Sequence, residues 1–330
     1  MNFRTPVGIQ AKKYPKITHA DTLMSLGSCF SNHIGDKLQR AKLDCQVNPY
    51  GVLYNPKSIA QALHELIRHK KYTSSDLFEY NGLWHSWMHH GSYSAPTPEL
   101  ALNQINKHLS EAQNRLPQLD YLFLTWGSAW VYELLSEERL VSNCHKVPSN
   151  LFRRVQLGVD EIVQIYCNLF RDLWVLCPSL KVVLSLSPIR HVRDGMHANQ
   201  ISKSILLLAQ DKIQQLYPDR VYYFPSYELV LDELRDYRFY ADDMVHPSPL
   251  AIDYIWQRFQ ETFFDSSTQA IIRACEQIQK GLAHRPTDAS ASAYASFLQD
   301  LVDKMEQLSI KYPKLDFRKE INQCLIQLKK

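Results

Sequence analysis

Short apolar runs alternate with segments of helical periodicity along most of this chain. Strands are predicted at residues 22–26, 43–47, 119–125, 181–186 and 221–224. The third and fourth runs are apolar on both faces, which is typical of the centre of a parallel sheet. Apolar spacing of three and four residues predicts helices between them, at about residues 30–38, 58–68, 99–115, 159–176 and 200–217. This alternation predicts a mostly parallel sheet sandwiched between helices.

The pattern changes after the last of these strands. Ile255 and Phe259 have helical spacing, and no strand-like run follows before the C-terminus. We therefore predict an α/β domain at residues 1–265 and a helical extension at 266–330. Residues 283–290 form the best candidate for a linker between the terminal helices. Those helices can cover the sheet or join copies of the chain in a homo-oligomer.

Composition narrows the class of protein only slightly. The 330 residues are 45% hydrophobic and 22% charged, which is ordinary for a soluble globular chain. A net charge of +3 is too small to indicate a nucleic-acid partner. The first residues lack the apolar run of a signal peptide, and no stretch approaches the roughly 20 apolar residues of a membrane span. We therefore expect a cytoplasmic protein without a membrane span.

Seven cysteines are scattered along the chain without CxxC spacing. An odd number without that spacing argues against a disulfide framework and against a thiolate zinc site. We expect free thiols in a reducing compartment. No pattern in the sequence requires a cofactor.

The motif Gly27-Ser28-Cys29-Phe30 lies where the first predicted strand meets the first predicted helix. A serine at such a corner is exposed at the edge of the sheet, beside helix N–H groups that attract developing negative charge. Ser28 is therefore the candidate nucleophile. The simpler interpretation is a turn with a serine helix cap. Cys29 is the alternative nucleophile, but we expect its side chain to turn into the core.

A serine nucleophile requires a base and a group that orients the base. His246 is the candidate base and Asp243, three residues earlier, is its candidate partner, although this spacing is also common at helix starts. The predicted oxyanion donors are the N–H groups of Ser28 and Gly51 and the side chain of Asn143, with two further side chains as substitutes. The substitutes are Asn48 and Ser128.

Further residues that follow predicted strands, or lie in nearby loops, are candidates for substrate binding. The carboxyl ends of parallel strands share one edge of the sheet, where ligands of open α/β folds bind. Arg190 can clamp a substrate carboxylate or phosphate there, or it belongs to a solvated basic loop. The candidate binding residues are Asn48, Trp126, Gly127, Ser128, His145, Lys146, Arg190 and His191.

Three histidines in one short segment are the nearest approach to a metal-binding pattern. His85 and His89 would share a helix face, with His90 beside them. The neighbouring glycines and aromatic residues favour strand or loop over helix, so we predict no metal site. A histidine of this segment can still contact substrate.

Several of these motifs together resemble the GSCFA family, whose name matches Gly27-Ser28-Cys29-Phe30-Ser31 except at the last position. The resemblance covers roughly residues 1–265, in order. The further matching motifs are NPYGVLYNP at 48–56, WGSAW at 126–130, NCHK at 143–146, SPIRH at 187–191 and YADDMVHP at 240–247.

The family is similar to SGNH, or GDSL-like, hydrolases, which implies a flavodoxin-like three-layer α/β/α sandwich. The resemblance places the nucleophile at Ser28, the second-block glycine at Gly51 and the Asp-x-x-His pair at Asp243 and His246. The third block departs from the pattern, because Ala129 stands where SGNH enzymes have the oxyanion-hole asparagine. Asn143 replaces that donor, or the oxyanion hole is weaker.

The resemblance implies chemistry on carboxylic esters. Six aromatic residues favour a substrate that is an acylated carbohydrate or glycoconjugate, because aromatic rings stack on sugar faces. These residues are Tyr50, Tyr54, Trp84, Trp87, Trp126 and Trp130. Two alternatives stay open: an acyltransferase that uses the same triad, and a carbohydrate-binding protein that retains the fold without efficient catalysis.

Overall fold

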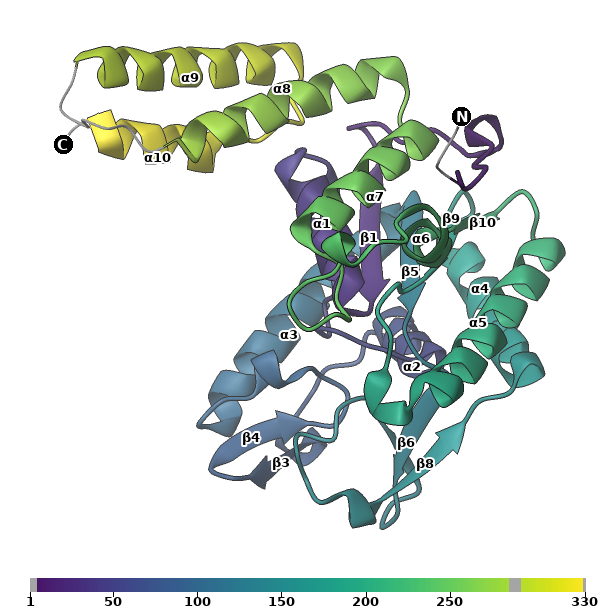
Figure 1. Cartoon of the computed structure of the whole chain (residues 1–330). Coiled ribbons are helices and arrows are strands. Elements are labelled where there is room, and N and C mark those ends of the chain that lie inside the picture. Colours follow the sequence, from purple (N-terminus) through teal and green to yellow (C-terminus); the bar gives the residue numbers. More distant parts are fainter. Residues whose placement is uncertain (1–4, 285–291, 329–330) are drawn as a thin grey trace.

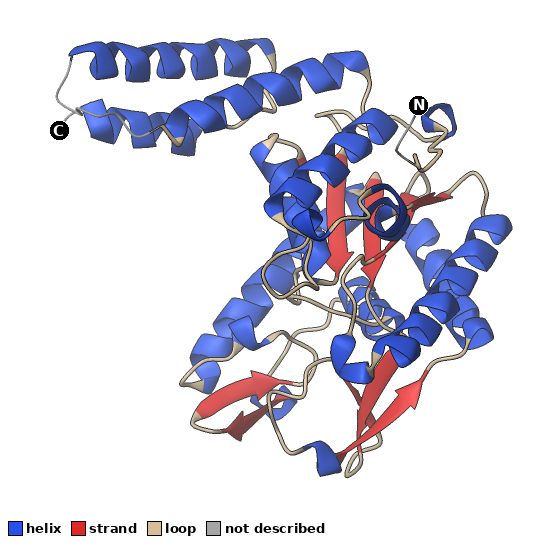
Figure 2. Ribbon diagram, viewed as in Figure 1, coloured by secondary structure: helices blue, strands red, loops and turns tan. Residues whose placement is uncertain are grey.

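The structure, a computed structural model, describes residues 5–284 and 292–328. Five parallel strands form the central sheet, in the order β10-β9-β5-β1-β2 (Figures 1 and 2). Counted within this sheet, the order is 2-1-3-4-5, that of flavodoxin-like folds. All five predicted strands are confirmed: β1 (Thr22–Gly27), β2 (Asp44–Val47), β5 (Tyr121–Trp126), β9 (Lys181–Leu186) and β10 (Val221–Phe224).

Helices cover both faces of the sheet, because successive side chains of a buried strand point to opposite faces. In β1, Leu23 packs with the helices of one face, while Met24 packs with those of the other. The first face carries α1 (Cys29–Arg40) and α7 (Pro249–Phe263). The second carries α2 (Pro56–Ile67), α3 (Pro98–Arg115), α4 (Val159–Leu176) and α5 (Met196–Leu216). The three-layer α/β/α sandwich is therefore confirmed.

Two small antiparallel sheets lie beyond the carboxyl edge of the main sheet (Figure 2). One is the hairpin of β3 (Leu77–Tyr80) and β4 (Leu83–Ser86), and the other has the order β7-β6-β8. Its strands are β6 (Trp130–Leu134), β7 (Arg139–Val141) and β8 (Phe152–Gln156). Apart from the histidine segment that contains β4, which was expected to be strand or loop, these strands were not predicted. Short strands with many half-exposed residues carry too weak an apolar pattern.

The C-terminal helices form a layer with its own hydrophobic cluster, which includes Leu298, Met305 and Phe317. They are α8 (Ser266–Leu282), α9 (Ser292–Lys311) and α10 (Arg318–Leu328), and no strand follows β10 in the described part of the chain. An ion pair of 2.6 Å between Lys42 and Glu320 joins α10 to the main body. Most of the predicted linker at 283–290 lies outside the described residues.

The polypeptide after β10 returns to the carboxyl edge of the sheet before α7 begins. It passes through α6 (Ser226–Glu228), which continues into one turn of π-helix (Leu229–Glu233), and then through the loop at residues 234–248.

None of the helices in the described residues is both long enough and apolar enough to cross a membrane.

Candidate active site

The corner between β1 and α1 requires glycine at position 27. Gly27 has φ of +150°, and a Cβ atom there would lie 2.2 Å from the carbonyl oxygen of Thr125 on β5. Only glycine allows the two strands to approach this closely. The Asn48 side chain accepts the Gly27 N–H at 2.8 Å and so holds the corner from the other side. The next residue, Ser28, is thereby fixed at the sheet edge.

Ser28 is the N-cap residue of α1, but its hydroxyl does not cap the helix. The side chain is 1% exposed, and its Oγ has no hydrogen-bond partner among the described residues. A serine kept for capping would accept an N–H from the first helical turn. The structure therefore disagrees with the simpler interpretation of Gly27-Ser28 as a capped turn. It leaves a buried hydroxyl without an assigned bond.

Asp243 and His246 form a local pair on the exposed loop before α7. His246 Nδ1 lies 2.5 Å from Asp243 Oδ2, and Asp243 Oδ1 accepts the backbone N–H groups of Val245 and His246, both at 2.9 Å. These bonds, the backbone N–H groups first, lower the pKa of Asp243 to about 2. The carboxylate is therefore charged and oriented toward the imidazole at neutral pH.

His246 lies near His33 of α1 and near His191 of the loop after β9. Positive charge on His246 lowers the pKa of both His33 on α1 and His191, in each case as a contribution smaller than that of burial. The Asp243–His246 pair therefore lies at the same edge of the sheet as Ser28. The Ser28 hydroxyl is not hydrogen-bonded to the imidazole of His246 or to that of His191 in this structure.

The two backbone donors predicted for the oxyanion hole are already hydrogen-bonded inside the protein. The Ser28 N–H donates to Thr125 O at 3.1 Å, and the Gly51 N–H donates to Asn48 O at 2.7 Å. Gly51 has φ of +74°, and a Cβ there would lie 2.3 Å from His90 Cβ. Glycine at 51 thus serves the turn and its close contact with the loop of β4, and the structure does not show its N–H directed at Ser28.

Asn143, the predicted side-chain donor, lies elsewhere. Its Oδ1 accepts the His145 N–H at 2.9 Å, and it lines a cavity of about 430 Å³ together with His145, Lys146 and His90. His145 Nε2 is in turn 2.8 Å from Ser86 O. Ser28 and His246 are not among the residues that line this cavity. The structure therefore does not bring the NCHK segment to the candidate nucleophile.

His191 is the side chain that the structure does bring to Ser28. A Cβ atom built on Gly127 would lie 3.3 Å from His191 Nε2 and 3.5 Å from Ser28 Cβ. The absent side chain of Gly127 thus leaves a small space that both residues border. Tyr54 packs edge-to-face on the His191 ring, at 5.7 Å between centroids. Burial, and then the charge of Lys203, lowers the pKa of His191 to about 4, so the ring is neutral at neutral pH.

Lys203, on α5, lies near Cys29 and His191 and was not among the residues predicted from the sequence. Its side chain is fully buried, and its Nζ donates to Ser187 O at 2.7 Å. Burial lowers the pKa of Lys203 to about 7, with a smaller contribution from the positive charge of Arg190. The available signal was spacing: Asn199, Lys203 and Leu206 repeat at four and three residues, on the helix face that packs inward.

Cys29 is half-buried, rather than fully packed in the core as expected. Burial raises the pKa of its thiol, against smaller opposing effects of helix N–H groups and of Lys203. A thiol whose pKa is raised stays protonated at neutral pH and is a poor nucleophile. The electrostatics therefore favour Ser28 over Cys29.

The family model "GSCFA family" matches residues 22–259, well over half of the chain. The chain belongs to the GSCFA family. A second model, "GSCFA domain protein, C-terminal domain", matches residues 275–330. No curated protein matches the sequence.

Solved structures similar to this GSCFA chain include two esterases. One is a carbohydrate esterase family 3 protein from Talaromyces cellulolyticus, with 10% identity, a TM-score of 0.34, and coverage of 78% of this chain and 99% of that one. The other is the acetyl xylan esterase Est2A from the rumen bacterium Butyrivibrio proteoclasticus. It has 10% identity, a TM-score of 0.36, and coverage of 77% of this chain and 63% of that one.

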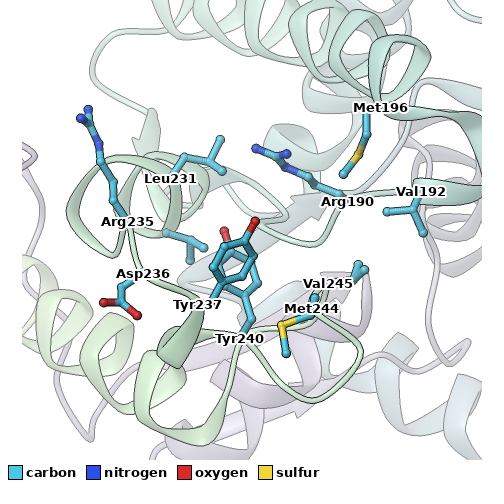
Figure 3. Close-up of a pocket in the computed structure, with 11 residues that line it drawn as sticks. Arg190, Val192, Met196, Leu231, Arg235, Asp236, Tyr237, Tyr240, Met244 and Val245 are labelled. Atoms are coloured by element: carbon cyan, nitrogen blue, oxygen red, sulfur yellow. The ribbon is translucent and has the colours of Figure 1, made fainter.

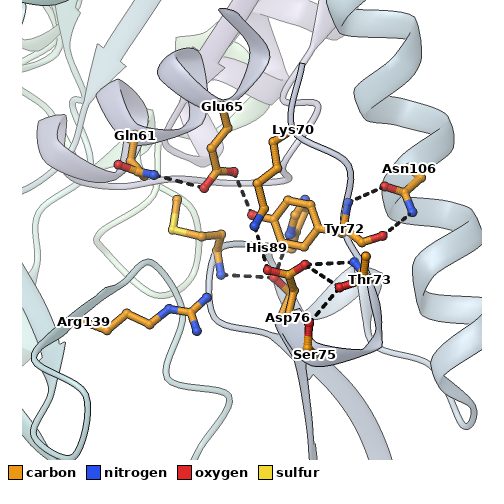
Figure 4. A network of polar contacts seen from close by, with 12 residues as sticks. Gln61, Glu65, Lys70, Tyr72, Thr73, Ser75, Asp76, His89, Asn106 and Arg139 are labelled. Carbon is orange, nitrogen blue, oxygen red and sulfur yellow. Dashed lines mark hydrogen bonds and ion pairs between the residues drawn. The ribbon is translucent and has the colours of Figure 1, made fainter. Parts of the chain in front are cut away.

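Several aromatic residues expected to contact substrate belong instead to the core of this GSCFA protein. Trp126 is fully buried, and its Nε1 donates to Tyr166 Oη at 3.0 Å, which corrects its predicted binding role. Tyr50 is also fully buried. Its hydroxyl donates to Glu65 at 2.9 Å. The Tyr72 hydroxyl donates to the same carboxylate at 2.7 Å, within the polar network of Figure 4. The rings of Trp126 and Tyr50 therefore pack in the hydrophobic core.

Two polar candidates likewise bond within the GSCFA fold. Asn48 bonds Gly27 and also donates to Asn32 at 2.6 Å. Ser128 is buried, and its Oγ accepts the Trp130 N–H at 3.2 Å. Both side chains therefore stabilise loops at the sheet edge.

Two other aromatic candidates are less buried. Tyr54 is 38% exposed. Trp130 is half-buried, and the guanidinium of Arg154 lies over its ring, 4.1 Å from the centroid.

The histidine cluster of this GSCFA chain forms no shared ligand set. His85 Nδ1 is 2.6 Å from Ser94 Oγ, and His89 Nδ1 is 2.9 Å from Ser86 Oγ. In the described residues, no group of three histidine, cysteine or acidic side chains is placed to hold a metal ion. The segment forms strand β4 and the turn after it, as the glycines and aromatic residues indicated.

Proposed function

We propose that this GSCFA protein is a serine-dependent carboxylic ester hydrolase. The observation that carries the proposal is the hydroxyl of Ser28: it is buried, has no partner among the described residues, and lies at the N-terminus of a 12-residue helix. A buried hydroxyl without a bond costs stability, and a reaction that uses the hydroxyl accounts for this cost at Ser28. Ser31 Oγ also lacks a partner, but only Ser28 occupies the corner between β1 and α1. The preformed Asp243–His246 pair at the same edge supplies a base with an oriented ring.

The proposed reaction proceeds through an acyl-enzyme. Ser28 Oγ attacks the ester carbonyl while His246 takes its proton, and Asp243 stabilises the imidazolium that forms. The tetrahedral intermediate then collapses, and His246 gives the proton to the departing alcohol. Water, activated in turn by His246, attacks the acyl group and releases the acid and free Ser28.

We assign the missing oxyanion donor to His191. Asparagine is absent at position 129, and the predicted backbone donors are hydrogen-bonded elsewhere. The Nε2 atom of His191 borders the space beside Ser28 that Gly127 leaves open. A neutral imidazole with hydrogen on Nε2 can donate one hydrogen bond to an oxyanion without competing with His246 for the serine proton.

The His191 assignment predicts a defect in turnover. His191→Ala is expected to lower kcat by about 10²- to 10³-fold with a small change in KM, because the lost bond forms only in the transition state. His191→Asn, which restores an N–H donor, is expected to recover part of kcat. His197→Ala is the matched control, since His197 is exposed near the start of α5. A normal kcat in His191→Ala would overturn the assignment.

Covalent labelling tests the nucleophile directly. A fluorophosphonate probe is expected to modify Ser28 in the folded protein, and mass spectrometry of peptides identifies the site. Labelling should vanish in Ser28→Ala and persist in Cys29→Ser. An unlabelled Ser28 in the folded protein would contradict the proposed hydrolase and favour a binding protein.

The proposed substrate class is an acylated carbohydrate or glycoconjugate. It is supported by aromatic side chains that remain accessible near the site: Tyr54 beside His191, and Tyr237 on the loop that leads to His246. Incubation with acetylated sugars, followed by product analysis with and without an added sugar acceptor, measures the fate of the acyl group. Transfer to the sugar in preference to water would reassign the protein as an acyltransferase.

A further inference from the structure

A cavity of about 450 Å³ lies beside the loops that carry His191 and His246, although Ser28 and these two histidines do not line it (Figure 3). Arg190 and Val245 both line it, and each immediately precedes one of the two site histidines, His191 and His246. The other walls come from the start of α5, from the π-helical turn after α6, and from the loop at residues 235–245. A substrate bound at Ser28 has to pass these histidines to enter the cavity, because neither Ser28 nor the histidines line it.

Arg190 is the cation in this cavity whose charge is not matched. Its Nε is buried without a hydrogen-bond partner, and none of the ion pairs of the described residues includes it. The other charged lining residues are already paired. Arg235 lies 3.3 Å from Asp232, and Asp236 accepts a bond of 2.7 Å from Arg238.

The charge behind Arg190 is also positive. Lys203 is fully buried, and the positive charge of Arg190 contributes to lowering its pKa, which shows that the two cations interact. Asp194, the nearby acidic residue on the same loop, is paired with Arg154. The guanidinium of Arg190, which has no carboxylate partner, attracts an anion into the cavity, because an unpaired charge that is removed from water is costly.

The remaining walls are suited to a ring with one polar face. Tyr237 and Tyr240 lie with their ring centroids 6.2 Å apart, and Figure 3 shows their side chains below the guanidinium of Arg190. Leu231 and Met244 add apolar surface. Aromatic and aliphatic walls with one cation favour a sugar ring that carries a negative group over an extended acidic chain.

We propose that this cavity binds an anionic substituent, a carboxylate or a phosphate, on the sugar of the ester substrate, with Arg190 as its counter-ion. This inference rests on the proposed function, since it takes the acylated sugar as the ligand. It makes the substrate an acylated uronic acid or an acylated sugar phosphate. A planar guanidinium binds either group through two parallel N–H bonds.

Binding of three small probes tests the inference without requiring hydrolysis. Methyl glucuronide carries a carboxylate, glucose 6-phosphate carries a phosphate, and methyl glucoside is neutral. Calorimetric titration of the full chain in its wild-type and Ser28→Ala forms is expected to show at least about 10-fold tighter binding of one charged probe than of the neutral one. Whichever charged probe binds identifies the anionic group. Equal binding of all three probes by the wild type would overturn the inference.

Variants identify the residue responsible. Arg190→Gln is expected to reduce binding of the preferred charged probe by about 10- to 100-fold and to leave methyl glucoside unaffected. Arg190→Lys should retain part of the preference, because it keeps the charge but loses the two parallel bonds. Arg193→Gln is the matched control: Arg193 is exposed on the same loop and does not line the cavity. A full charge preference in Arg190→Gln would overturn the assignment.

The two proposals fail in distinguishable ways. Charge-dependent binding through Arg190 in a protein that shows no fluorophosphonate labelling would refute the hydrolase and leave the anion site standing. Labelled Ser28 in a protein without charge preference would refute the anion site alone.

Discussion

Replacing Ser28 with alanine is expected to lower kcat for a short-chain aryl ester by about 10⁵-fold or more, because no other group then forms the acyl-enzyme. Hydrolysis of the ester by purified protein, compared with the buffer rate, measures the loss. The fold should survive the change. Because Ser28 Oγ is buried and unpartnered, its removal is expected to leave the melting temperature equal or slightly raised.

Ser31 provides a matched control for this experiment. It lies in the same helix, is equally buried, and its Oγ also lacks a partner among the described residues. Ser31→Ala removes an unsatisfied hydroxyl as Ser28→Ala does, so a similar melting temperature with nearly normal turnover is expected. Full activity in Ser28→Ala together with loss of activity in Cys29→Ser would show that the nucleophile is the thiol.

Asp243→Asn is expected to lower kcat by about 10⁴-fold. The amide can still accept the backbone N–H groups of Val245 and His246, so the loop keeps its conformation, but it cannot stabilise an imidazolium. Because these N–H groups and the His246 ring hold the pKa of Asp243 at about 2, the wild-type carboxylate is charged above about pH 3. The ratio of wild-type to variant kcat should therefore stay large at every pH from about 4 to 9.

Asp242→Asn separates this role from a general loss of negative charge. Asp242 is the exposed neighbour of Asp243. Asp242→Asn changes the size and charge of the side chain as Asp243→Asn does. Its kcat is expected to remain within about threefold of the wild-type value, since surface charges contribute little. If both variants lost activity equally, the carboxylate of Asp243 would act through the net charge of the loop and not through His246.

The sequence alone was sufficient for elements whose information is local. Apolar runs predicted all five strands of the parallel sheet. The signal is strongest for β1, β5 and β9, because strands buried on both faces are apolar along nearly their whole length. The Gly27-Ser28 corner and the Asp243–His246 spacing were likewise visible, since a turn and a three-residue reach depend on neighbours in the chain. The identities of Ser28, Asp243 and His246 as candidates came from this level.

Only the tertiary structure decided what surrounds Ser28. His191 and Ser28 border the same small space beside Gly127, although His191 lies more than 150 residues after Ser28 in the sequence. Whether an N–H such as that of Gly51 is free depends on which carbonyl packs against it, and burial of Trp126 depends on the helix that covers it. Periodicity along one segment carries no information about these partners, because they are set by how separate segments pack together.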